Sequence, residues 1–278
     1  MQILFSALMG LVQGLAEFLP ISSSGHLLVA EKLLALLGYD VTSSQSLQIM
    51  LHMGTLLAVF VVFFQDWVQM LLHPIKNKTL LLLFVASLPA LFAMLLVGDL
   101  VETAFSGWFL GPAFLVTALF LYLAENAGKS RHAQKSGEIT LSRAITMGCF
   151  QAVALLPGVS RSGSTLFGGI LSGLTRSMAA KFSFMMSAPA ILGSFLTEVK
   201  DAAEQGQMGS LFSLDIMVGV LVAAISGYMA IRYMLRLIEK ISLTRFSVYL
   251  VIVGVLVIVC QLTGFAGFPP LAFPGIAP

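Results

Sequence analysis

An arginine lies among small polar residues at 157–165, PGVSRSGST, in a chain that is otherwise mostly apolar. Placing arginine at membrane depth costs at least about 2.5–3.5 kcal/mol, so we expect an anionic partner for Arg161. A guanidinium fits phosphate oxygens in a bidentate way, and a helix starting near Thr165 would direct free N–H groups to the same point. The segment predicts a phosphate-binding site, with two alternatives left open: Arg161 caps carbonyl groups, or it pairs with Glu17.

A carboxylate and an amide form a second polar group near the N-terminus. Glu17 follows Gln13 by four residues, so both side chains lie on one helical face, which Gly10 and Gly14 flank for close packing. The pair could bind a divalent metal, orient a catalytic imidazole or accept a proton, or Glu17 could serve only as an ion-pair partner. Two such side chains make a weak metal site, so a metal there would also need phosphate oxygens and water.

Serines and a histidine follow directly, in the sequence PISSSGH at 20–26. His26 is a candidate general base, general acid or phosphate acceptor, and a serine beside such a base is a candidate nucleophile, with Ser23 as the first choice. His52 also lies in an apolar stretch, but no partner for it is visible in the sequence, and we interpret it as structural. The residues predicted to bind phosphate are Ser22, Ser24, Ser160, Arg161, Ser162, Gly163, Ser164 and Thr165.

Long apolar runs must position these polar groups. Of the 278 residues, 58% are hydrophobic and 10% are charged, whereas an average soluble domain has about 25% charged residues. No polar stretch is long enough to form a soluble domain. We predict an all-α polytopic membrane protein, a single integral membrane domain over residues 1–278, with membrane lipids and no nucleic acid as partners.

Ten helical segments are expected from the apolar runs. Two of them, 26–37 and 165–174, are much shorter than the ~20 residues that a span requires, and each follows a polar break. We therefore predict six spanning helices plus two re-entrant helical hairpins, one at each polar break. The ten segments are 3–19, 26–37, 47–65, 79–97, 108–123, 141–156, 165–174, 179–196, 214–235 and 246–262. Most Lys and Arg residues then fall on one side, which is cytoplasmic by the positive-inside rule, and both termini are predicted to be periplasmic.

An internal repeat agrees with this plan. Residues 9–27, MGLVQGLAEFLPISSSGHL, align with residues 147–166, MGCFQAVALLPGVSRSGSTL. Each half, approximately 1–123 and 141–263, would hold one hairpin and three spans, so the second half is inverted relative to the first. The two polar breaks then enter from opposite faces and meet near the midplane, which is the inverted-repeat plan of many transporters.

The same residues carry a resemblance to a known family. QGLAE at 13–17 fits the pattern (E/Q)-x-x-x-E, PGVSRSGST fits P-G-x-S-R-S-x-x-T, and EFLPISSSGH at 17–26 resembles an N-terminal signature. Over essentially its whole length the chain resembles the bacterial undecaprenyl-diphosphate phosphatases, also called bacitracin-resistance proteins. The resemblance implies dependence on a divalent metal, Mg²⁺ or Ca²⁺, and a location in the bacterial inner (plasma) membrane.

The reaction that the resemblance implies is hydrolysis of undecaprenyl diphosphate to the monophosphate and phosphate, which recycles the lipid carrier for cell-wall synthesis. In the expected mechanism Arg161 grips the diphosphate, and His26, oriented by Glu17, activates water or Ser23. These four are the predicted catalytic residues, and Gln13 and Glu17 are the predicted metal ligands. The competing hypothesis is a polyprenyl-phosphate flippase, and the oligomeric state is open, with a homodimer among the alternatives.

Overall fold

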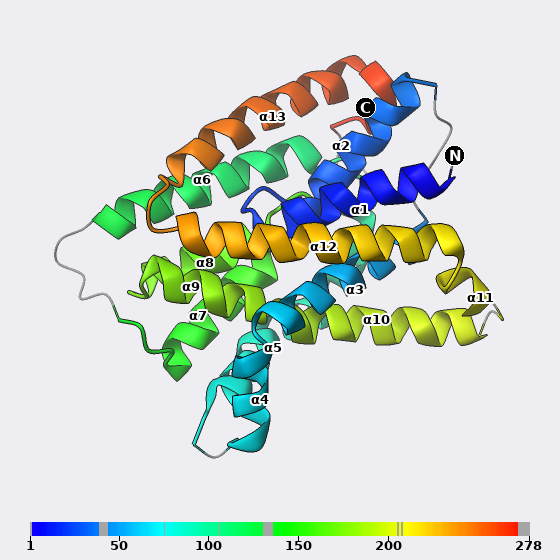
Figure 1. The fold of residues 1–278 in the computed structure, drawn as a ribbon. Helices are drawn as coiled ribbons and strands as arrows, with labels where there is room; N and C mark the ends of the chain where they lie inside the picture. Colours follow the sequence, from blue (N-terminus) through cyan, green and yellow to red (C-terminus); the bar gives the residue numbers. More distant parts are fainter. Residues whose placement is uncertain are drawn as a thin grey trace.

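The computed structural model describes residues 2–38, 44–74, 76–104, 106–129, 136–204, 206 and 208–271. Over these residues the chain forms thirteen α-helices and one short 3₁₀ helix, and no β-strand (Figure 1). The helices are α1 (Gln2–Phe18), α2 (Ser23–Leu36), α3 (Gln45–Val62), α4 (Phe64–Leu72), α5 (Thr79–Ala104), α6 (Leu110–Lys129), α7 (Leu141–Val153), α8 (Arg161–Leu171), α9 (Arg176–Met185), α10 (Ser187–Glu204), α11 (Met208–Leu211), α12 (Leu214–Leu237), α13 (Thr244–Thr263) and η1 (Phe265–Gly267).

The long helices confirm the prediction of an all-α, multi-pass membrane protein. Within the described ranges, five helical stretches are long and apolar enough to cross a bilayer, and a sixth is reached if α3 and α4, bent by 75°, count as one span. These stretches overlap the six segments predicted to span. The five are Thr79–Val101, Leu110–Gly128, Arg176–Glu204, Leu214–Leu237 and Thr244–Thr263.

Two of the predicted segments are divided in the structure. The third segment ends at Phe63, where the chain bends into α4. The eighth is divided at Met186, between α9 and α10. Pro189 lies in the first turn of α10, where its missing N–H loses no helical hydrogen bond, so a new helix tolerates it there. The four-residue helix α11 is a further element that the apolar pattern did not predict.

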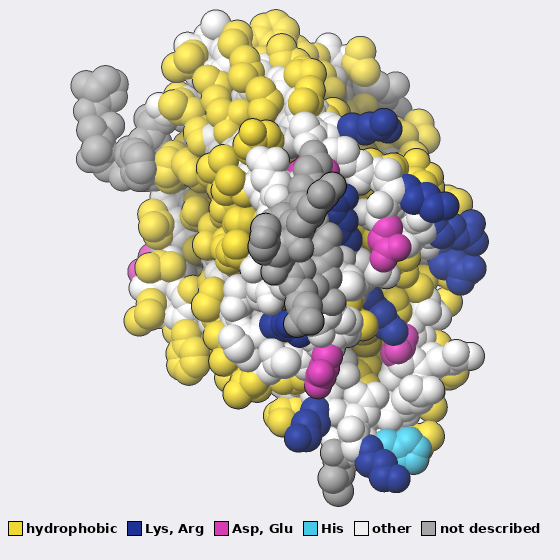
Figure 2. Space-filling view, turned by 90° about the vertical axis from the view of Figure 1, so that its left-hand side faces the viewer, with side chains coloured by type: hydrophobic (Ala, Val, Ile, Leu, Met, Phe, Trp, Pro, Cys, Tyr) yellow, Lys and Arg dark blue, Asp and Glu magenta, His cyan; other side chains and the backbone are white. Residues whose placement is uncertain are grey.

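The surface is apolar along the spans and basic at one end. On α5, Leu95 and Leu96 are 75% and 83% exposed, which is favourable only if lipid covers them. Lys and Arg side chains gather on the face shown in Figure 2, where α6 and α12 end and α13 begins. This charge asymmetry follows the positive-inside pattern. The predicted periplasmic termini, residues 1 and 272–278, lie outside the described residues.

Each of the two polar breaks lies between a pair of short helices. α1 and α2 have 17 and 14 residues, and α7 and α8 have 13 and 11. At 1.5 Å per residue, α8 is only about 17 Å long, against about 30 Å of bilayer hydrocarbon. In Figure 1, α1 runs inward from one side of the molecule and α2 runs back toward that side. We call residues 20–26 the first tip and residues 157–165 the second tip.

Close backbone contacts fix the helices that precede the tips. α1 packs along α12, and α7 packs along α5. A Cβ atom on Gly10 would overlap the carbonyl oxygen of Gly219, and a Cβ atom on Gly148 would overlap the carbonyl oxygen of Ala86. Glycine at these two positions therefore allows the helix pairs to approach closely, as small residues do between membrane helices.

Candidate active site

The two tips start their second helices with the same capping contact. Ser22 Oγ accepts a hydrogen bond from the Gly25 N–H at 3.2 Å, and Ser160 Oγ accepts one from the Gly163 N–H at 3.0 Å. Each serine is thus an N-cap that satisfies one of the N–H groups left unpaired at a helix start. Ser22 also has a φ of 74°, which is uncommon for a residue with a side chain and occurs often at functional sites. In each tip the helix begins at the residue directly after the cap.

The first helical residues of the two tips meet at one buried carboxylate. Arg161 donates through Nη2 to Glu17 Oε1 in an ion pair, and Ser23 Oγ donates to Glu17 Oε2 at 2.6 Å. Gln13 Nε2 donates to the same Oε2 at 3.0 Å, and His52 Nε2 lies 3.7 Å from it. Glu17 is only 7% exposed. The structure therefore realises the open alternative in which Arg161 pairs with Glu17.

Two further hydrogen bonds join the tips directly. The Ser162 hydroxyl donates to the Leu19 carbonyl at 3.0 Å, and the Gly158 N–H donates to Ser24 Oγ at 3.3 Å. Gly158 has a φ of 90°, a left-handed conformation that glycine adopts without a steric penalty. The polar segments that the sequence places far apart thus form one connected group, as predicted.

Ser183 on α9 is a residue that the sequence analysis missed. Its carbonyl accepts a hydrogen bond from Arg161 Nη1 at 3.2 Å, and its hydroxyl lies 2.5 Å from Thr165 Oγ1. Thr165 Oγ1 also donates to the Arg161 carbonyl at 2.8 Å. A single serine in the apolar run AKFSFM gave no motif, so only its burial in a membrane segment could have indicated it.

His52 on α3 is the second missed residue. Its Nδ1 lies 2.7 Å from the Gln48 carbonyl, which can only accept, so Nδ1 carries a proton. Nε2 is the ring nitrogen that lies toward Glu17, 3.7 Å from Oε2. No partner for His52 is visible in the sequence, whereas the structure places its Nε2 beside the central carboxylate. Its structural role stays a prediction.

The expectation that Glu17 orients His26 is wrong. His26 Nδ1 lies 2.7 Å from the Ser22 carbonyl, and Nε2 lies 2.7 Å from the hydroxyl of Tyr249 on α13. Both ring nitrogens are thus engaged by other groups. The physical reason is the cap at Ser22: α2 begins at Ser23, so His26 is one turn further along and points toward α13, whereas Ser23 faces Glu17.

Ser164 stands apart from the other predicted phosphate-binding residues. It is fully buried in α8, and within the described part of the chain its hydroxyl has no hydrogen-bonding partner. Ser160, also buried, receives a hydrogen bond at its cap and donates its own N–H to Thr117 Oγ1 at 2.9 Å. Ser160 therefore supports the second tip from within, and Ser164 is buried away from the site, whereas Arg161, Ser162 and Thr165 reach the centre of the site or its walls.

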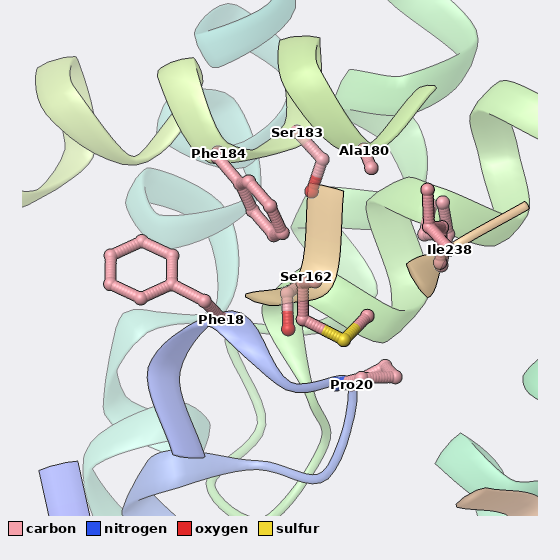
Figure 3. Close-up of a pocket in the computed structure, with 9 residues that line it drawn as sticks. Phe18, Pro20, Ser162, Ala180, Ser183, Phe184 and Ile238 are labelled. Atoms are coloured by element: carbon pink, nitrogen blue, oxygen red, sulfur yellow. The ribbon is translucent and has the colours of Figure 1, made fainter. Parts of the chain in front are cut away.

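A small cavity adjoins this centre, and it is mostly apolar. Figure 3 shows the rings of Phe18 and Phe184 beside it, with the hydroxyls of Ser162 and Ser183 at its wall. The rings contact each other edge to face, with centroids 5.4 Å apart. The two rings therefore make this side of the site apolar.

Gln13 and Glu17, the predicted metal ligands, could supply only part of the coordination of a metal ion. Gln13 is fully buried, and no described residue donates a hydrogen bond to its Oε1, so this oxygen is available as a ligand beside the Glu17 carboxylate. Over the described ranges, no group of three or more His, Cys, Asp or Glu side chains could hold a metal ion. The pair therefore suits a cation that takes its remaining ligands from phosphate and water, as Mg²⁺ does.

Fold and site together define a class: a helical multi-pass membrane protein with a buried arginine, carboxylate and hydroxyl group between two polar tips. Comparison with known proteins gives the family. The family model described as bacitracin resistance protein BacA matches residues 6–256. The chain belongs to this family, which confirms the resemblance found in its motifs.

Individual relatives agree over nearly their whole length. The chain is 39% identical over 257 residues to undecaprenyl-diphosphatase 4 of Bacillus thuringiensis subsp. konkukian, covering 92% of this chain and 96% of the relative. It is 38% identical over 264 residues to the undecaprenyl-diphosphatase of Halothermothrix orenii, covering 93% and 98%. It is 38% identical over 289 residues to the undecaprenyl-diphosphatase of Methanobrevibacter smithii, covering 95% and 99%.

Proposed function

We propose that this protein is an integral membrane phosphatase that hydrolyses undecaprenyl diphosphate to undecaprenyl phosphate and phosphate. The observation that carries the proposal is the buried contact of Arg161 and Ser23 with Glu17, between two tips that resemble each other. The three side chains supply a cation for the phosphate, a hydroxyl nucleophile and a base for its proton. The names of the relatives indicate that the substrate is a lipid diphosphate.

Substrate binding exchanges one anionic partner of Arg161 for another. Without substrate, the guanidinium and the Glu17 carboxylate neutralise each other, which a buried pair of charges requires. An entering diphosphate offers oxygens for bidentate hydrogen bonds and draws Arg161 toward it. The Ser183 carbonyl and the Thr165 hydroxyl hold the arginine and its tip in place during this exchange.

Ser23 is the proposed nucleophile, and Glu17 is its base. The Ser23 hydroxyl already donates to Glu17 Oε2 at 2.6 Å. As Ser23 Oγ forms a bond to the terminal phosphorus, its proton passes to Glu17, and the bond to the bridging oxygen breaks to release undecaprenyl phosphate. Release of Arg161 from Glu17 leaves the carboxylate more basic at this moment. The product of the step is a phosphoserine at Ser23.

Water completes the reaction at the phosphoserine. His26 Nε2, one turn from Ser23 on α2, takes a proton from water as the water oxygen attacks phosphorus. The bond between phosphorus and the Ser23 oxygen breaks, and this oxygen recovers its proton from Glu17. His26 then releases the proton from water to the solvent. Phosphate leaves, and Arg161 returns to Glu17. Gln13 and Glu17 would hold a divalent metal, Mg²⁺ or Ca²⁺, which when bound neutralises charge on the phosphate oxygens. Side chains of this chain carry out the proton transfers and the nucleophilic attack by Ser23.

The proposed architecture is an inverted repeat with two re-entrant hairpins, α1–α2 and α7–α8. Three features support it: the matching caps, the shortness of these helices, and the equivalent packing of α1 on α12 and of α7 on α5. The basic face of Figure 2 is proposed to be cytoplasmic, with both termini periplasmic and the protein in the bacterial inner membrane.

Phosphate release from a polyprenyl diphosphate by the purified protein in detergent tests the function. We expect turnover with Mg²⁺ or Ca²⁺ and its loss on chelation, because the phosphate charge then lacks a counter-ion. Lipid-phosphate movement between the leaflets of vesicles without any phosphate release would instead assign the protein as a flippase and end the proposal.

A further inference from the structure

The hydrogen bonds of His26 define which ring nitrogen carries a proton. Nδ1 lies 2.7 Å from the Ser22 carbonyl, which can only accept, so Nδ1 bears hydrogen. In the neutral imidazole, Nε2 is then an acceptor, and the Tyr249 hydroxyl 2.7 Å away is its donor. The two contacts together fix the tautomer that a general base acting through Nε2 requires.

Two aromatic rings fix the plane of the imidazole. The Tyr249 ring stacks on His26 with centroids 5.7 Å apart and 15° between the planes, and Phe114 contacts it edge to face at 5.3 Å and 74°. We call the rings of Phe114 and Tyr249 the clamp. Phe114 is fully buried, so this side of the clamp is rigid. Gly25 makes room for it, because a Cβ atom there would lie 2.6 Å from the Phe114 ring.

Tyr249 closes the other side of the clamp from a different helix. It lies on α13, which packs against α6, and its side chain is 41% exposed. A phenol hydroxyl both donates and accepts, so the same contact persists whether Nε2 is an acceptor or a donor. An exposed side chain can also move away from Nε2 when substrate or water needs that position.

We propose that Tyr249 is a positioning residue for His26: its hydroxyl, hydrogen-bonded to Nε2, and its stacked ring hold the imidazole in one orientation until a reactant replaces the hydroxyl. This inference rests on the proposed role of His26 in the hydrolysis. It assigns to α13 of the second half a part in orienting a base that belongs to the first tip.

Tyr249→Phe tests the hydroxyl, because it keeps the stacked ring. Losing one hydrogen bond that orients a base is expected to lower kcat about tenfold with little change in KM, since the substrate is not bound by Tyr249. Tyr249→Leu removes the ring as well, and its kcat should be lower still. The matched control is Tyr233→Phe on α12, where the tyrosine is 56% exposed, and its rate should equal that of the wild type.

A second measurement does not depend on activity. The chain has four histidines, so ¹⁵N labelling of histidine gives few ring signals, and His26→Ala identifies those of His26. We expect the Nε2 signal of His26 to shift in Tyr249→Phe and to stay in Tyr233→Phe. An unchanged Nε2 signal, or a wild-type kcat in Tyr249→Phe, overturns the inference. If the wild-type protein released no phosphate, the proposed function would be wrong. The ring signals of His26 would still show whether Tyr249 contacts Nε2.

Discussion

The two tips share a serine cap and a short helix but differ in chemistry and in the backbone at the cap, where φ is 74° at Ser22 and −69° at Ser160. Each has a serine N-cap that binds the N–H three residues later, and each is followed by a short helix. At matching positions the side chains differ. Glu17, Ser23 and His26 of the first half correspond to Leu155, Arg161 and Ser164 of the second half, at a constant separation in the sequence alignment.

The difference shows how a repeated scaffold can make one asymmetric site. A capped tip occurs in both halves, whereas the proposed acid–base groups occur only in the first half and the proposed phosphate-binding arginine only in the second. A buried charge at this depth is costly when unpaired, so Arg161 and Glu17 each lower the cost of burying the other. Pairing Arg161 with Glu17 thus joins the halves and prepares the site at the same time.

Removing the proposed nucleophile, Ser23, from the first tip should have the largest effect. Ser23→Ala is expected to lower kcat on the order of 10⁴-fold or more, because losing a covalent nucleophile disables the whole catalytic unit. The measurement is phosphate release by purified protein, with acid-quench trapping of a phosphorylated serine in the wild type.

Ser24→Ala is the matched control for Ser23. The Ser24 hydroxyl contacts the Gly158 N–H at 3.3 Å and not the carboxylate, so the loss should be much smaller. If the two variants were equally active, Ser23 would not be the nucleophile. The proposed chemical difference between the two tips would then be wrong.

The cation of the second tip should rank next. Arg161→Ala is expected to lower kcat/KM about 10³-fold, because a preorganised charge on the phosphate is lost and Glu17 is left without its partner. Arg161→Lys should recover only part of this, since an ammonium cannot bind in a bidentate way. Arg232→Ala, at an exposed position of α12, is the control and should leave the rate unchanged. Full activity of Arg161→Lys would show that charge alone suffices.

His52 offers a sharper test of how the carboxylate is held. His52→Ala removes a side chain whose Nε2 lies 3.7 Å from Glu17 Oε2, and we expect kcat to fall about tenfold, the scale of one modest polar contact. Steady-state kinetics of phosphate release measures it, with His73→Ala as the control in an exposed turn. A loss as large as that of Ser23→Ala would instead make His52, and not Glu17 alone, the base.

Sequence reasoning found the tips but not the contacts around them. Spacing alone placed Gln13 with Glu17 on one face, and Arg161 at depth required an anion; the structure pairs Arg161 with Glu17, which was one of the open alternatives. Sequence reasoning paired His26 with Glu17, although the cap at Ser22 turns the ring toward Tyr249. Contacts of Ser183 and Tyr249 depend on how distant helices pack, and no local pattern encodes that.

The smallest expected effect tests the scaffold itself, at the glycines that occupy the same position in the two tips. A Cβ atom on Gly25 would lie 2.6 Å from the Phe114 ring, whereas one on Gly163 would lie 3.1 Å from the Thr117 methyl. Phe114 is fully buried and cannot withdraw, so Gly25→Ala should destabilise the protein by about 1–3 kcal/mol and Gly163→Ala by less. Thermal unfolding in detergent measures both. Equal melting temperatures would mean that the tips tolerate crowding alike. The tighter packing of the first tip against the Phe114 ring, which also holds His26, would then have no energetic consequence.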